Sequence, residues 1–119
     1  MPQDFKPGDF LIFQLESGYG LLRVLDVQTN AGETVWHLAA YADLFLDVDI
    51  ADKALEHPEN LSVSNPHIAL TNRAFESTQV AKLKNQPLTT TDMTAYSLWK
   101  NDPLAGVSDR SVRLMLGIR

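Results

Sequence analysis

Apolar and β-branched residues in the N-terminal third of the chain fall into two runs separated by a short glycine-containing segment. The first run is FLIFQL at 10–15, the second is LLRVLDV at 21–27, and SGYG at 17–20 lies between them. Two runs of this length joined in this way are typical of a β-hairpin. TNAGE at 29–33 is a further turn signal and predicts a third strand after it. The pattern therefore predicts an antiparallel meander.

Apolar and polar residues then alternate from residue 36 to residue 50. The even positions are apolar: Trp36, Leu38, Ala40, Ala42, Leu44, Leu46, Val48 and Ile50. The odd positions include polar, acidic and aromatic residues: His37, Tyr41, Asp43, Phe45, Asp47 and Asp49. Because successive side chains of a strand point to opposite faces, we predict one long bent strand, or two strands that meet at a bulge. Its even face would be buried and its odd face would be acidic.

Shorter elements are predicted after this alternation. A helical turn would begin at Asp49 or Asp52 as N-cap and would be closed by Pro58. A strand is expected near residues 68–70, and a second, less regular one within residues 75–84.

The strongest helix signal lies in residues 87–103. Thr90 or Thr91 can cap it, and Asp92 in the first turn complements the helix dipole. Pro103 stops it.

Residues 108–118 fit two structures. Ser108 and Gly117 suit the two caps of a helix, whereas apolar residues also alternate here as in a strand, and we favour the helix. No repeat or linker divides the chain, so residues 1–119 are expected to form one domain. The predicted fold class is α+β: an antiparallel, β-rich meander resembling a partly open SH3-like barrel, with one or two helices packed late in the chain.

Composition narrows the setting of this domain. The chain has 119 residues and no cysteine, so disulfides and thiolate metal sites are excluded. Its longest apolar runs, such as FLIF and LFL, are too short to cross a bilayer, and MPQDFKPGDF at the start does not have the pattern of a secretory signal. We therefore expect a cytoplasmic protein that does not contact a membrane.

Charge is concentrated in one part of the sequence. Residues 43–59 hold six acids and one base, and their sum equals the net charge of −5 of the whole chain. The acids are Asp43, Asp47, Asp49, Asp52, Glu56 and Glu59. The modest basic excess after residue 82 does not make the continuous basic surface that nucleic acids need, so nucleic acid is not expected as a partner.

The acidic stretch does not form a recognised metal motif. A calcium-binding EF-hand loop beginning at Asp47 needs glycine at its sixth position and glutamate at its twelfth, where this chain has Asp52 and Pro58. Alternating carboxylates would still share a face, so a loose site for Mg²⁺ or Ca²⁺ is an alternative. We predict no metal ligands and no cofactor.

The three histidines also lack metal-binding spacing. His57 and His67 stand beside prolines in predicted turns, and we expect both to be exposed. His37 is expected on the surface as well, with its basicity raised by the acidic face. The chain has no GxSxG nucleophile motif, so we assign no catalytic residue and expect a protein that is not an enzyme.

Aromatic residues among the carboxylates suggest a binding face. Tyr41 and Phe45 fall on the same odd positions as the acids, and partner surfaces often combine aromatic anchors with polar rims. The alternative is that the late helix covers this face. The predicted partner-binding residues are Tyr41, Asp43, Phe45, Asp47, Asp49 and Asp52.

Two segments resemble a known family. GDFLIFQL followed by GYGLLRVLDV, within residues 8–27, resembles the opening hairpin of bacterial immunity proteins that accompany polymorphic toxins, those of the twenty-sixth type. PLTTTDMTAYSLWKNDPLAGV at 87–107 is similar to the helix near their C-termini. These motifs are structural and transfer no site residue. The resemblance implies a small cytoplasmic protein that binds and blocks a cognate toxin.

Three hypotheses follow. The first is a non-catalytic protein-binding domain, an immunity protein, whose acidic strand face docks a basic toxin. The second is a small metal-assisted hydrolase that uses Asp43, Asp47 and Asp49. The third is a structural domain that forms oligomers; the sequence leaves its oligomeric state open.

Overall fold

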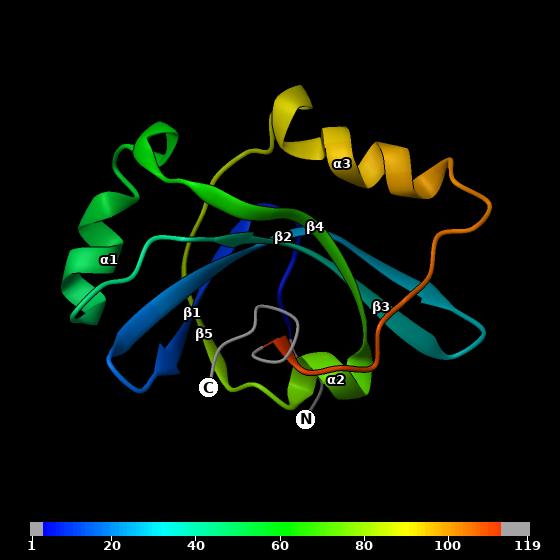
Figure 1. Cartoon of the computed structure of the whole chain (residues 1–119), viewed down its shortest axis with the longest axis horizontal. Helices are drawn as coiled ribbons and strands as arrows, with labels where there is room; N and C mark the ends of the chain where they lie inside the picture. The colour runs from blue at the N-terminus through cyan, green and yellow to red at the C-terminus, as the bar shows by residue number, and fades with distance from the viewer. Residues whose placement is uncertain (1–3, 113–119) are drawn as a thin grey trace.

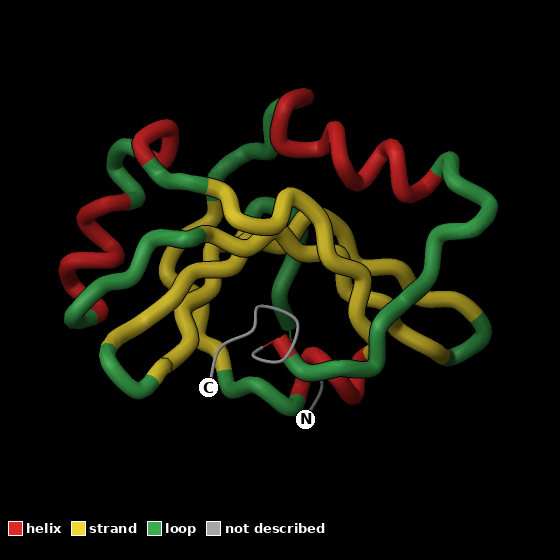
Figure 2. The backbone as a smooth tube through the Cα atoms, in the orientation of Figure 1, coloured by secondary structure: helices red, strands yellow, loops and turns green. Residues whose placement is uncertain are grey.

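The computed structural model describes residues 4–112, and one sheet of five strands lies at its centre. The strands are β1 (Asp9–Leu15), β2 (Gly18–Asn30), β3 (Glu33–Tyr41), β4 (Val63–Thr71) and β5 (Val80–Asn85). Their order is β4-β3-β2-β1-β5, and every neighbouring pair is antiparallel. The sheet ends at β4 and β5, so it is a curved open layer and not a closed barrel (Figure 2). The predicted α+β class with an antiparallel meander is confirmed.

Helices cover both faces of the sheet. The helical elements of the described residues are α1 (Val48–Ala54), the 3-10 helix η1 (Pro58–Asn60), α2 (Asn72–Glu76) and α3 (Thr90–Lys100). α1 and α3 lie on one face, and α2 lies on the other (Figure 1). Within residues 4–112, no helix has the length and apolar character needed to span a membrane.

Tight turns fix the register of the first three strands. Ala31 and Gly32 join β2 to β3 with φ angles of 53° and 81°, as in the two-residue turns that suit twisted hairpins. At the other end of β2, the chain passes so close to Gly18 that a Cβ atom there would lie 2.5 Å from the Phe45 carbonyl oxygen. Both predicted hairpins are confirmed, but the first turn is shifted: Glu16 and Ser17 form it, and Gly18 already pairs with Leu15 in the sheet.

The two faces of the sheet bury separate clusters. The face that carries α2 holds the largest one, built from Leu11, Phe13, Leu15, Leu22, Val24, Trp36, Leu38, Ala40, Ile68, Leu70, Ala74, Phe75 and Val112. The cluster between α1 and the sheet consists of Phe10, Ile12, Leu21, Ala51 and Leu55. The cluster between α3 and the sheet consists of Leu25, Ala39 and Tyr96. Alternate residues of β1, β2 and β3 therefore point into different clusters, as the period of a strand requires.

The predicted long strand ends earlier than its alternation indicates. β3 stops at Tyr41, and residues 48–54 form α1. Asp47 caps this helix, because its side chain accepts a hydrogen bond from the Ile50 amide at 2.8 Å. Ala51 and Leu55, one helical turn apart, are buried against the sheet. The strand prediction for residues 43–50 was wrong because capping and one buried helical pair outweighed the alternation.

The limits predicted for this helix were also wrong. Its cap is Asp47 rather than Asp49 or Asp52, and it closes at Leu55, while Pro58 begins η1.

The late helix is confirmed with a shifted start. Thr89, not Thr90 or Thr91, is the N-cap, and it forms a capping box with Asp92. The helix ends at Lys100, before Pro103. Of residues 108–118, only 108–112 are described, and Ser108 pairs with Leu70 in an isolated parallel bridge. The choice between helix and strand for the remainder lies outside the described residues.

Candidate binding site

The predicted partner-binding residues lie along one segment but do not share a strand face. Tyr41 ends β3, Asp43 and Phe45 lie in the following loop, and Asp47 caps α1. Asp49 and Asp52 are exposed on α1.

Two of these acids have structural bonds. The Asp43 carboxylate accepts a hydrogen bond from the Ser62 amide at 2.6 Å, which fixes the loop beside the start of β4. The Asp47 carboxylate accepts the Ile50 amide as described above. Changing either residue would therefore alter the local fold as well as the charge.

The two aromatic residues pack inward. Phe45 exchanges backbone hydrogen bonds with Tyr19, of 2.7 and 2.9 Å, and is half-buried in the cluster under α1. Tyr41 is half-buried beside Phe10, with 5.9 Å between the ring centroids. The prediction that these rings lie on an acidic face is replaced by a position at the edge of the core.

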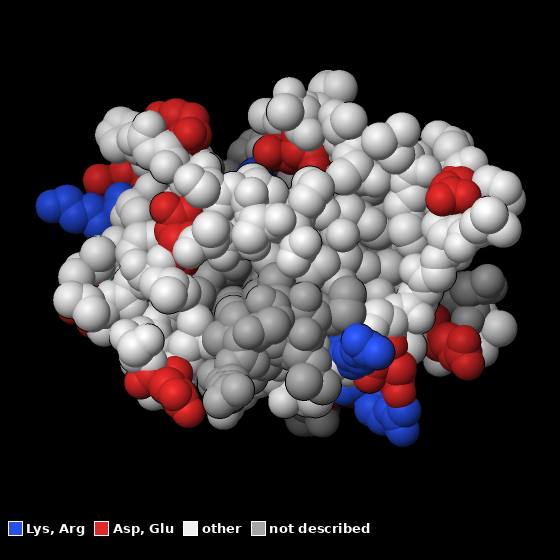
Figure 3. All heavy atoms as spheres, in the orientation of Figure 1, with Lys and Arg blue, Asp and Glu red and all other residues white. Residues whose placement is uncertain are grey.

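The apolar residues predicted to be buried are the exposed ones. Leu44, Leu46, Val48 and Ile50 have 59, 81, 39 and 48% of their surface accessible. Together with Asp43, Asp47, Asp49 and Asp52 they form what we call the acidic–apolar surface. Acidic side chains are visible over the side of the molecule that carries α1 (Figure 3). A run of large apolar side chains in water, bordered by charge, is characteristic of interaction sites.

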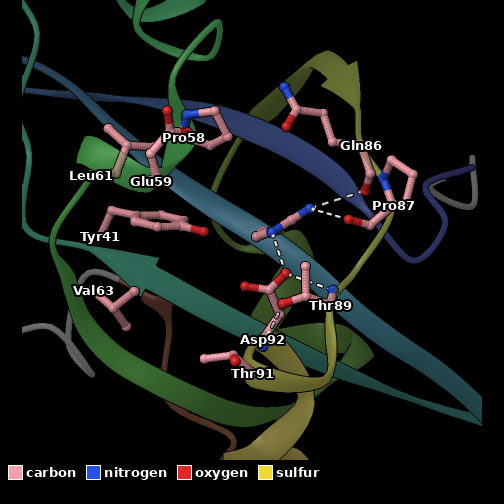
Figure 4. Close-up of a pocket in the computed structure, with 11 residues that line it drawn as sticks. Tyr41, Pro58, Glu59, Leu61, Val63, Gln86, Pro87, Thr89, Thr91 and Asp92 are labelled. Atoms are coloured by element: carbon pink, nitrogen blue, oxygen red, sulfur yellow. Dashed lines mark hydrogen bonds and ion pairs between the residues drawn. The ribbon is translucent and has the colours of Figure 1, made fainter.

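A cleft lies beside this surface, between the start of β4 and the first turn of α3 (Figure 4). It has a cavity of about 390 Å³ and adjoins a second, mostly apolar cavity of about 210 Å³. Both are lined by Arg23, Tyr41, Val63, Thr91 and Asp92. η1 and the residues between β5 and α3 complete the wall of the larger cavity.

Arg23 lines both cavities of the cleft and is only 5% exposed. One terminal nitrogen donates to Asp92 Oδ2 at 3.0 Å, and the other donates to the carbonyls of Gln86 and Pro87 at 3.0 and 3.1 Å. The guanidinium carbon lies 4.5 Å from the centroid of the Phe10 ring. These partners allow the charge to remain in a nearly buried position.

The Tyr41 ring lines the cleft and is affected by the charges around it. Burial raises the pKa of its hydroxyl, the positive charge of Arg23 opposes that shift, and the carboxylates of Asp92 and Asp43 add to it. The hydroxyl therefore keeps its proton at neutral pH.

Sequence reasoning missed the cleft. One signal was available, because Arg23 alternates with Leu21 and Leu25 on a face that is otherwise apolar. The pairing of Arg23 with Asp92, 69 residues away, could not be read from either local pattern.

A histidine pair lies under the other part of α3. His37 is fully buried, so the expectation that it is a surface residue was wrong. Its Nδ1 lies 2.9 Å from His67 Nε2, and its Nε2 lies 2.6 Å from Gln28 Oε1. Because the Gln28 oxygen only accepts, His37 Nε2 carries the proton and Nδ1 accepts from His67. His67 is half-buried in β4 and not in an exposed turn, which corrects the second histidine prediction.

Aromatic side chains of α3 enclose this pair. The Tyr96 and Trp99 rings lie 4.6 and 4.7 Å from the His37 ring, and the Tyr96 hydroxyl donates to Asp26 at 2.6 Å. Burial is the main cause that lowers the pKa of His37 to about 4; the charges of His67 and Lys100 contribute to this shift, and Asp26 partly opposes it. The predicted increase in basicity was therefore wrong. The pair is therefore enclosed between the sheet and α3.

Within residues 4–112, no group of three or more histidine, aspartate or glutamate side chains is placed to hold a metal ion. The hydrolase hypothesis for Asp43, Asp47 and Asp49 thus gains no geometric support.

Comparison of this chain with protein-family models, curated proteins and solved structures found no match. The resemblance to immunity proteins stays a prediction.

Proposed function

We propose that this chain is a non-catalytic protein-binding domain that docks a basic protein on its acidic–apolar surface. The observation that supports this most is the exposure of Leu44, Leu46, Val48 and Ile50 next to carboxylates. Burying such side chains releases about 25 cal/mol for each Å² of apolar surface removed from water. Interfaces commonly combine an apolar centre with a polar rim.

Charge selects the kind of partner. Asp49 and Asp52 on α1 are exposed, and the segment that carries them has most of the excess negative charge of the chain. A basic partner would be drawn to this side and would associate faster at low salt.

An immunity protein that blocks a basic toxin in the cytoplasm is the specific form of this proposal. The resemblance in residues 8–27 and 87–107 supports it, and these residues form the β1–β2 hairpin and α3. The acidic–apolar surface, within residues 43–52, lies between these two segments in the sequence.

To test this, the chain is produced in its native host cell with a photo-crosslinking amino acid in place of Leu46. The protein cross-linked there is purified and its binding to the isolated chain is measured. Leu46→Asp removes apolar character from the centre of the surface, and Asp49→Lys combined with Asp52→Lys reverses the charge without touching the Asp47 cap. Leu104→Asp is the matched control, because Leu104 is 91% exposed and lies after α3.

We expect a basic partner whose affinity falls at least tenfold with Leu46→Asp, about 1.4 kcal/mol or more. The double charge reversal should slow association and remove most of its salt dependence, whereas Leu104→Asp should leave binding unchanged. If the partner arrests cell growth when it is produced alone, and does not when this chain binds it, it is a toxin. Cross-linking to a second copy of this chain would instead support the oligomer-forming hypothesis, and equal effects of Leu46→Asp and Leu104→Asp would reject the surface.

A further inference from the structure

The cleft adjoins the acidic–apolar surface at Asp43. The loop that carries Asp43 is tied to the start of β4, since Ser62 donates its amide to Asp43 and accepts the Ala42 amide through its carbonyl at 2.7 Å. The neighbouring residues Leu61 and Val63 line the cleft. A partner that binds the acidic–apolar surface and extends past Asp43 would therefore reach the mouth of the cleft.

The charges in the cleft favour a cation. Of the described residues that line it, Arg23 is the basic one, and Asp92 and two carbonyl groups already engage its terminal nitrogens. Glu59 lies at the rim, with its side chain 68% exposed. Asp43 is close enough to raise the pKa of Tyr41. The carboxylates therefore outnumber the guanidinium around the opening, and they lie on the most acidic side of the chain.

The cleft also offers unused acceptor atoms. Asp92 Oδ2 receives both the Arg23 bond and the Thr89 amide, at 3.0 and 2.8 Å. In the described part of the chain no donor bonds to Asp92 Oδ1, and one carboxylate oxygen of Asp92 points toward Tyr41 (Figure 4). Glu59 Oε1 already lies 3.3 Å from His57 Nδ1, so its other carboxylate oxygen is the one available at the rim. Together with Asp92 Oδ1, it can accept hydrogen bonds from a planar group that carries several N–H donors.

The walls suit an aliphatic stem with a flat head. The Tyr41 ring, Leu61, Val63 and Pro87 form apolar sides, and the inner cavity adds Leu25 and Ala39. Long cationic side chains bury their methylene groups against such surfaces and stack their guanidinium on aromatic rings. The larger cavity, about 390 Å³, is within the usual range of small-ligand sites, roughly 300–1,000 Å³.

From these contacts we infer that the cleft is an anchor site for a guanidinium group, supplied by an arginine side chain of the basic partner. The inference rests on the proposed function for the identity of the partner, but the site itself is a property of this chain. The arginine head bonds to Asp92 Oδ1 and Glu59 beside the Tyr41 ring, while its stem contacts Leu61 and Val63. Arginine and tryptophan residues held in such pockets often dominate the energy of an interface.

The test is an NMR titration of the isolated chain with Nα-acetyl-arginine amide, which carries one guanidinium and a blocked backbone. We expect saturable shifts of the backbone amides of Leu61, Thr91 and Asp92, with a millimolar dissociation constant. The matched probe is Nα-acetyl-citrulline amide, which has the same shape without the charge. It should bind at least tenfold more weakly, and the lysine analogue should fall between the two.

Two variants test the site itself. Thr91→Trp places a large side chain at the exposed start of α3 and should abolish the shifts by filling the cleft. Glu59→Gln should weaken the arginine probe roughly two- to fivefold and leave the citrulline probe unchanged. Glu56→Gln is the control, because this exposed acid lies close in sequence and does not line the cleft.

Equal binding of arginine and citrulline, or shifts that map away from these residues, would overturn the inference. So would equal effects of Glu59→Gln and Glu56→Gln, a readout that does not depend on how Thr91→Trp folds. Because the probe is a small molecule, this result stands apart from the search for a protein partner. A guanidinium site without a partner at residue 46 would keep the cleft and reject the proposed function.

Discussion

Arg23 and His37 are polar side chains on the same face of the sheet, from neighbouring strands, and both are almost or fully buried. The groups around the two side chains have opposite effects on a positive charge. Arg23 faces a carboxylate and two carbonyl oxygens. His37 faces a second histidine and an amide oxygen. The first environment retains a cation, whereas the second favours a neutral ring.

The difference follows from the two ends of α3. Its first turn brings Asp92 to Arg23, and Asp92 also completes the capping box, so one carboxylate stabilises both the helix start and the buried cation. Farther along, Tyr96 and Trp99 cover His37 with aromatic rings. The start of α3 therefore borders an open cleft that contains a charged pair, while its later turns cover a closed contact of uncharged rings.

This comparison separates a site that can bind from one that stabilises. The Arg23 side has a cavity and unused acceptors at its opening. On the His37 side, the polar groups are bonded to one another: the Tyr96 hydroxyl to Asp26, and His37 Nε2 to Gln28.

The largest expected effect is a loss of stability in acid that comes from His37. The fold lowers the pKa of His37 from 6.5 to about 4, so between these values the unfolded chain binds more protons than the folded one. The free energy of unfolding should therefore decrease as the pH falls from about 6.5 toward 4, by roughly 3 kcal/mol in total. Burial also lowers the pKa of His67, which adds to the loss in the same direction.

Urea denaturation of the wild type and of His37→Phe from pH 7.5 to pH 4 measures this effect. Carboxylates, Lys100 and Asp26 are present in both proteins, so the difference between the two slopes isolates His37 and its coupling to His67. Parallel slopes would show that His37 is as accessible to protons in the folded protein as in the unfolded chain.

The next effect concerns the charge of Arg23. Asp92→Asn removes the carboxylate while leaving the cation only 5% exposed, and we expect the free energy of unfolding at pH 7 to fall by about 2–3 kcal/mol. This is below the range for fully buried pairs because the Asp92 side chain is 29% exposed. Asp102→Asn, at an exposed position after the same helix, is the control and should cost less than about 0.5 kcal/mol. Similar losses from both variants would mean that water already screens Arg23.

Comparing the predicted with the observed elements shows which sequence patterns are sufficient to predict a helix or a strand. The hairpins were predictable because glycine-containing turns separate runs whose period matches a strand. α3 was predictable because capping residues and Pro103 mark its limits. The stretch 43–50 was not, since its alternation suits a strand, while Asp47 and the buried pair of Ala51 and Leu55 determine a helix. That pair gains its energy from Phe10 and Ile12, residues distant in the sequence.

The same limit applies to the sites. The sequence located the concentration of acids, because charge is additive along a chain. It placed the apolar residues of the acidic–apolar surface inside the protein, since burial depends on which residues the rest of the chain covers. Arg23, Asp92 and Glu59 come together from β2, α3 and η1, so no local pattern contained the cleft.

A smaller effect is expected on the sealed side. Tyr96→Phe removes the hydroxyl that donates to Asp26 at 2.6 Å, and we expect a loss of about 1 kcal/mol. Asp26 keeps the hydrogen bond from the Val27 amide, which limits the cost. Tyr19→Phe, at a half-buried position in the cluster under α1, is the matched control and should change the free energy of unfolding by less than about 0.5 kcal/mol in urea denaturation. Equal losses would argue that the Tyr96 hydroxyl is bonded to water.

The smallest expected effect is the sharpest test of the comparison. Arg23→Met keeps an unbranched side chain over Phe10 and removes the charge, and the partly exposed Asp92 can turn to water while it retains the Thr89 amide. The Gln86 and Pro87 carbonyls can also bond to water, because both residues line the open cleft. We therefore expect less than about 1 kcal/mol of lost stability, since the acceptors that Arg23 leaves behind can all reach water and no charge is left buried without a partner. In the Arg23→Met background, Asp92→Asn should cost less than 1 kcal/mol, giving a coupling of about 2 kcal/mol in the double-mutant cycle. A loss above 3 kcal/mol from Arg23→Met alone would make the cation a structural requirement of the fold, whereas a small loss would leave the pair of Arg23 and Asp92 to be explained by what the cleft binds.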